Sequence, residues 1–143
     1  MRTTVFGSVA LLLCAGAGCS RGPNLVLLPV AGKVTLAGKP LPRGTVSLRP
    51  DGARGNTSLH HPTGSIDAKG RYQVFTIGRP GAPPGHYKVV VFANEEEKTA
   101  AGVHPPLPKS IIRPLYNQEA TTTLAVEVVE NAGDTTYDLR LEP

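Results

Sequence analysis

The stretch Ala31-Gly-Lys-Val-Thr-Leu-Ala-Gly-Lys-Pro-Leu-Pro-Arg-Gly-Thr-Val-Ser-Leu48 decides the fold class. Val34 and Leu36 alternate with small or polar residues, which is the two-residue period of a strand with one buried face. Residues 38–44 then contain two glycines and two prolines, which interrupt a strand because proline lacks a backbone donor and glycine frees φ. Val46 and Leu48 restart the alternation, so we expect an opening β-hairpin.

The same pattern of short strand and turn continues to the end of the chain. Residues 71–76, 86–92, 123–129 and 135–141 alternate in the same way, and Asp67 with Gly70 predicts a tight turn. We expect residues 123–129 and 135–141 to form a closing hairpin across residues 130–134. These short strands without a long helix predict an all-β fold, a Greek-key β-sandwich of about seven strands.

Length and composition fit one such domain. The chain has 143 residues, Gly 16, Pro 14 and no Trp, so the core must consist mainly of Val, Leu and Ile. The net charge of +4 comes from scattered Lys and Arg. A nucleic-acid-binding protein would show a basic stripe, usually with stacking aromatic residues, so we expect no nucleic-acid partner.

Residues 1–18 have the pattern of a signal peptide. Arg2 provides the positive end, an apolar run follows, and small residues lead to Cys19. The run is too short to cross a hydrocarbon core of about 30 Å. The approach to Cys19 resembles a bacterial lipobox, although Gly16 stands where leucine is usual. The resemblance implies that Cys19 is acylated, becomes the mature N-terminus and anchors an exported protein to a membrane of the cell envelope.

An ordinary secretory signal is the alternative interpretation of this segment. Under the lipid interpretation, residues 19–29 are the lipidated cysteine and a tether, and residues 30–143 are the domain. The apolar part of the tether, residues 25–29, is expected to pack on the domain edge, with contact to the bilayer surface as the alternative. The mature chain then has no free thiol and no disulfide.

Residues 94–122 form a loop that the sandwich does not explain, because strand connections are usually short. Asn94 and Glu97 have the spacing of a capping box, which predicts at most two helical turns. The segment is either a tolerated insertion or a partner-docking arm, acidic at its start and returned to the domain by Ile111, Ile112 and Tyr116. Its candidate interaction residues are Glu95, Glu96, Glu97, His104 and Tyr116.

We expect no catalytic site, metal or cofactor. His60 and His61 are neighbours that would point to opposite faces of a strand, whereas zinc needs three or four ligands. No Gly-x-Ser-x-Gly motif is present. Three of the four tyrosines are expected to face inward, so a sugar-stacking surface is poorly supplied.

The ordered motifs resemble a known family. Residues 32–42, 67–72 and 81–89, followed by Ile112-Arg-Pro-Leu-Tyr116, Thr123-Leu124 and Tyr137-Asp-Leu-Arg-Leu141, resemble small bacterial lipoproteins that consist of one carboxypeptidase regulatory-like, transthyretin-like β-sandwich. This resemblance implies a non-catalytic envelope protein with a structural or protein-interaction role. A module that binds a carbohydrate or another ligand of the envelope is the alternative.

Overall fold

The computed structural model describes residues 24–96 and 107–143, and it is an all-β structure. Its strands are β1 (Ala31–Leu36), β2 (Lys39–Pro40), β3 (Gly44–Pro50), β4 (Thr63–Ile66), β5 (Arg71–Gln73), β6 (Phe75–Thr76), β7 (Arg79–Pro80), β8 (Gly85–Phe92), β9 (Ala125–Val128) and β10 (Leu139–Leu141). Two short 3-10 helices, η1 (Gly52–Arg54) and η2 (Pro114–Asn117), lie in the connections.

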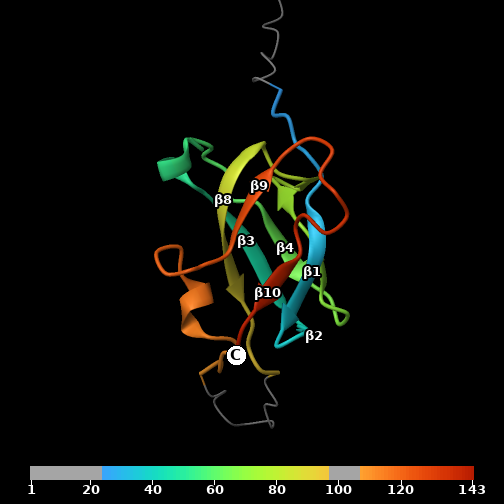
Figure 1. Ribbon diagram of the computed structural model, residues 1–143, viewed down its shortest axis with the longest axis vertical. Coiled ribbons are helices and arrows are strands. Elements are labelled where there is room, and N and C mark those ends of the chain that lie inside the picture. Colours follow the sequence, from blue (N-terminus) through green and yellow to red (C-terminus); the bar gives the residue numbers. More distant parts are fainter. Residues whose placement is uncertain (1–23, 97–106) are drawn as a thin grey trace, which may run out of the picture.

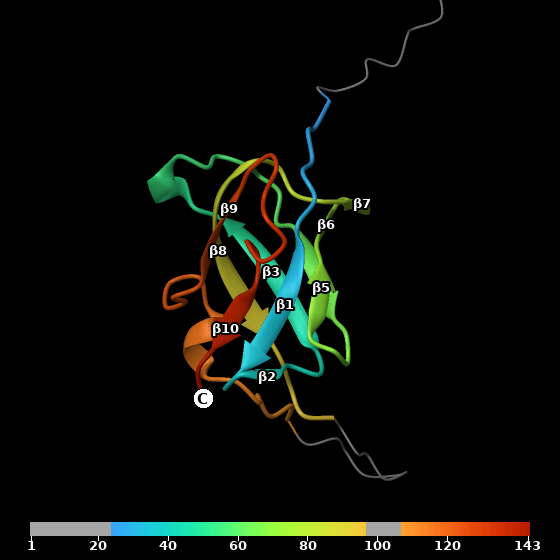
Figure 2. The same cartoon turned by 45° about the vertical axis from the view of Figure 1, so that its right-hand side comes forward.

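The strands form one curled sheet in the order β10-β1-β5-β4-β3-β8-β9, with β2 on β1 and with β6 joining β4 to β7. All pairs are antiparallel except β1 with β10. The curl is visible in Figures 1 and 2, and in Figure 2 β1 and β10 lie in front of β3 and β8. The two layers enclose the core, which makes the arrangement sandwich-like and confirms the expected all-β class.

The core is aliphatic with four buried tyrosines, as the composition requires. Tyr87, Val89 and Val91 on β8 face it, opposite Val46 and Leu48 of β3. The predicted inward row of β8 is therefore confirmed. On the other face of β8, Val90 is also buried while Phe92 is 42% exposed, which agrees with a partly covered outer face.

The predicted opening hairpin is wrong. The strand β1 turns at Ala37 and Gly38 and pairs with the short β2, and it has no ladder with β3. Gly44, with φ 138°, then redirects the chain so that β3 pairs with β4 and β8. A side chain at Gly44 would meet the carbonyl of Phe92, so the residue type is set by this close approach.

The predicted closing hairpin is also wrong. The strand β9 pairs with β8, whereas β10 lies parallel to β1 in the other layer. The inward residues of both strands reach the core from opposite sides, so the hydrophobic pattern alone does not distinguish this arrangement from a hairpin. The carboxylate of Asp138 accepts a hydrogen bond of 2.8 Å from the Lys33 amide and helps to hold β10 beside β1.

The capping box predicted at Asn94 is not used. Asn94 is extended and forms an antiparallel bridge with Ser110. Glu97, the second member of the predicted box, lies outside the described residues. This backbone bridge holds the two ends of the long segment side by side.

Candidate functional site

The two ends of the segment predicted as an interaction loop are held together at its base. The Glu95 amide donates to the Lys109 carbonyl (2.8 Å), and the Ile111 amide donates to the Ala93 carbonyl (3.0 Å). Two exposed ion pairs lie at the same place, Glu95 with Lys109 at 3.5 Å and Glu96 with Arg43 at 3.4 Å. Both predicted acidic residues are thus on the surface, next to basic partners.

Tyr116, the fifth candidate residue of this loop, lies in the core. Its side chain is 4% exposed, and its hydroxyl accepts a hydrogen bond of 3.0 Å from the Glu142 amide. Ile112 is buried beside it, so this part of the segment packs on the domain. Tyr116 therefore positions the segment, and its side chain does not present a surface to a partner. The candidates Glu97 and His104 lie outside the described residues.

The tether also meets the domain. Leu28 forms a bridge with Ala82 through two backbone hydrogen bonds, of 2.9 and 3.0 Å, and its side chain packs against the core. The expected packing of the apolar tether on the domain edge is found here. Cys19 and the signal segment before it lie outside the described residues.

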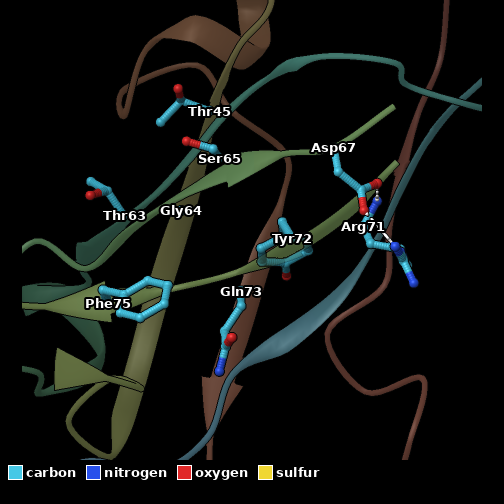
Figure 3. A pocket seen from close by; sticks show the side chains of 9 residues that line it. All are labelled: Thr45, Thr63, Gly64, Ser65, Asp67, Arg71, Tyr72, Gln73 and Phe75. Carbon is cyan, nitrogen blue, oxygen red and sulfur yellow. Dashed lines mark hydrogen bonds and ion pairs between the residues drawn. The ribbon is translucent and has the colours of Figure 1, made fainter. Parts of the chain in front are cut away.

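The outer face of the sheet carries a hollow of about 570 Å³ that the sequence did not single out. It lies over β3, β4, β5 and β6, with the Asp67–Arg71 turn at one end and Phe75 at the other (Figure 3). Between them are the polar side chains of Thr45, Thr63, Ser65 and Gln73. We call this surface the outer-face groove.

The charged end of the groove is a structural turn. The Asp67 carboxylate accepts hydrogen bonds from the amides of Lys69 and Arg71 (2.8 and 2.9 Å), and the Arg71 guanidinium binds it as well. The Arg71 amide, with the other donors, lowers the pKa of Asp67. A carboxylate held in its charged form by its own turn is unsuited to act as a general acid, so we assign Asp67 to the turn.

Tyr72 lies under the groove and is bonded inward. Its hydroxyl donates to the Tyr137 carbonyl at 2.6 Å, and burial raises its pKa well above the usual range. Apart from the Asp67–Arg71 ion pair at its end, the groove therefore offers neutral hydroxyl and amide groups beside one exposed aromatic ring, that of Phe75. Such a lining suits a neutral ligand with several hydroxyl groups, since a ring provides an apolar contact and the polar groups provide hydrogen bonds.

The histidines do not converge in the part of the chain that the structure describes. The Arg49 guanidinium contacts Nδ1 of His61 at 2.8 Å, whereas His86 lies 3.5 Å from the Glu127 carboxylate. Within residues 24–96 and 107–143, no three His, Cys, Asp or Glu side chains are placed to hold a metal ion.

Within those same ranges, no helix has the length and apolar character needed to cross a membrane. Comparison of the chain with protein-family models, with curated proteins and with solved structures finds no match.

Proposed function

We propose that this protein is a non-catalytic lipoprotein of the bacterial cell envelope, anchored through Cys19, whose β-domain has a structural or protein-interaction role. The observation that carries the proposal is the placement of two segments at opposite ends of the domain. The tether leaves at one end, and the base of the segment between Asn94 and Ser110 lies at the other (Figures 1 and 2). An anchor at the first end presents the second end away from the membrane.

The lipid anchor is tested by replacing its acceptor. Cys19→Ala should move the protein from the membrane fraction to the soluble fraction, because the acyl chains supply the membrane affinity. Cys14→Ala is the matched control and should remain in the membrane fraction. A Cys19→Ala protein that stays with the membrane contradicts the proposal.

The interaction role is tested at the segment between the two bridge residues. Because Asn94 and Ser110 already pair, residues 97–106 can be replaced by a short Gly-Ser link without opening the core. We expect crosslinking in intact cells to lose a specific envelope partner, with an unchanged melting temperature. The control is a Gly-Ser segment of the original length, which shows whether a lost partner depends on the residues of the segment or on its length. An unchanged crosslinking pattern favours a purely structural role.

We also propose that the domain is a carboxypeptidase regulatory-like sandwich, as the order of its motifs suggests. The all-β, sandwich-like arrangement supports this proposal. The turn within the motif has a clear local reason here: the Asp67 carboxylate closes its own turn, and Gly70 has φ 76°. Such a domain has no catalytic residues of its own and acts by presenting a surface.

A second candidate function is the binding of a neutral, hydroxyl-rich ligand such as an envelope glycan in the outer-face groove. Phe75 is 42% exposed there, next to the polar residues of β4 and β5. A glycan array on the full chain, with Phe75→Ala as the variant, tests this function. Leu59→Ala, an exposed apolar residue outside the groove, is the control. Binding that is lost only with Phe75→Ala supports the ligand-binding role.

A further inference from the structure

The large apolar side chains that remain exposed gather at one end of the domain. Among residues 24–96 and 107–143, five of the seven such side chains belong to segments near the tether: Val26, Leu59, Phe75, Ile77 and Val129. The tether itself contains Val26, and its bridge from Leu28 to Ala82 lies just beyond the β6–β7 hairpin that carries Phe75 and Ile77. We call these five residues the tether-end patch.

The remaining two segments of the tether-end patch reach the same end by different routes. Val129 follows β9, whose Val128 pairs with Gly85 at the start of β8, and it lines a hollow together with Leu28. The loop of residues 55–62, which contains Leu59, crosses this end in both views (Figures 1 and 2). The patch therefore combines four segments that are distant in sequence.

Within the tether-end patch, Ile77 is the residue whose presence is least accounted for by packing or backbone geometry in the domain. It occupies the first position of the two-residue β6–β7 turn, where Ile77 and Gly78 have φ 49° and 71°. Asparagine or glycine is strongly preferred at such a position, and a β-branched residue there is strained. The side chain is also 75% exposed, so packing within the domain does not compensate for the strain. An external apolar contact would account for both features.

The chain length limits where that contact can be. Nine residue-to-residue steps lead from Cys19 to Leu28, the first residue in the described part of the tether that is bonded to the domain. Fully extended, they span at most about 30 Å. If Cys19 is acylated, as in the function proposed above, the tether end of the domain is always within that distance of the bilayer.

We propose that the tether-end patch is a docking surface for the lipid bilayer, with Ile77 as the residue that enters the interface. Arg79 is exposed beside the tip and suits the headgroup region, while Glu130 and Asp134 are exposed on the neighbouring loop. The charges at this end are therefore mixed, and the apolar residues provide the attraction. Docking would fix the orientation of the domain and direct the Asn94–Ser110 base away from the membrane.

The test places a reporter on the full acylated chain. After acylation of Cys19, the mature chain has no free thiol, so Ile77→Cys provides a single site for an environment-sensitive fluorophore. Phe92→Cys is the matched control, because Phe92 is an exposed apolar residue outside the patch. The labelled proteins are reconstituted into phosphatidylethanolamine–phosphatidylglycerol vesicles with nitroxide groups on the acyl chains. We expect quenching at position 77 and none at position 92.

A second variant tests the role of Ile77 itself. With the reporter at Val129→Cys, adding Ile77→Asn should lower the ratio of docked to undocked protein about tenfold, since the transfer of one large aliphatic side chain is lost. The mass of the N-terminal peptide reports acylation separately. Acylated protein without quenching at position 77, or with equal quenching at 92, overturns the docking surface and leaves the anchor intact. An unmodified Cys19 overturns both proposals.

Discussion

Tyr72→Phe should destabilise the domain by about 1–3 kcal/mol at neutral pH, because it leaves a buried acceptor without its donor. The Tyr72 hydroxyl is buried and donates to the Tyr137 carbonyl at 2.6 Å, which joins β5 to the chain just before β10. Phenylalanine fills the same space, so the expected loss reflects the hydrogen bond and the unsatisfied carbonyl. No cavity contributes.

The same substitution should change how stability depends on pH. Burial raises the pKa of Tyr72, so in the folded protein the hydroxyl keeps its proton at pH values where the unfolded chain loses it. The contribution of Tyr72 is complete below the unfolded pKa of about 10 and decreases as the pH rises above it. The wild-type protein should therefore lose about 1.4 kcal/mol per pH unit relative to Tyr72→Phe in this range.

Urea unfolding at neutral pH and at several alkaline pH values measures both effects. We expect the advantage of the wild-type protein to shrink and then reverse as the pH increases. Equal slopes for the two proteins above pH 10 would refute the reasoning, since they would mean that the Tyr72 hydroxyl titrates alike in both states. An unchanged stability at neutral pH would show that the bond to Tyr137 contributes nothing net.

Four further substitutions test the fold and the patch. Asp67→Asn should remove a contribution to stability that is lost at acid pH. The pKa of Asp67 is lowered in the folded protein, so this contribution is present above the unfolded pKa and is lost as the pH falls through the folded pKa. In thermal unfolding from pH 6 to pH 2, only the wild-type protein should show this loss. Val89→Ala should lower the free energy of unfolding in urea by about 1–3 kcal/mol, and Phe92→Ala on the outer row of β8 should lower it clearly less. Equal losses for the two variants would contradict the register of β8. Ile77→Asn should leave the free energy of unfolding unchanged or raise it by about 0.5–1 kcal/mol, because it relieves a positive φ, and a large loss would show that Ile77 has a structural role.

The strands and turns could be predicted because their signals are local. The alternation of Tyr87, Val89 and Val91 requires one buried face whatever lies opposite, and the Asp67 carboxylate closes its own turn. The pairing of strands could not be predicted in the same way. Val128 and Leu139 are both buried as expected, yet they belong to strands in different layers. Burial is satisfied by either arrangement, and the choice depends on contacts such as Asp138 to the Lys33 amide.

The outer-face groove could not be predicted because its residues look like a loop in the sequence. Residues 63–65 are Thr-Gly-Ser, without the apolar alternation that marks a strand. Gly64 nevertheless belongs to β4, and its missing side chain admits the Gln73 carbonyl, which a Cβ would overlap. The close approach of β4 and β5 that creates the groove thus depends on a glycine that, in sequence, favours a turn.

The segment of residues 94–122 returns to the domain at Ile112 and Tyr116, as expected, and the burial of these two side chains fixes that return. Its two ion pairs are largely exposed, and exposed pairs contribute little, about 0–1 kcal/mol each, and less at high salt. Burying Ile112 and Tyr116 contributes more, at about 1.5–3 kcal/mol for a large apolar side chain. The base of this segment, where Asn94 pairs with Ser110, should therefore keep its position when salt screens the ion pairs of Glu95 and Glu96. Under the proposed interaction role, these two carboxylates would exchange their basic partners for those of another protein while the buried side chains hold the base of the segment in place.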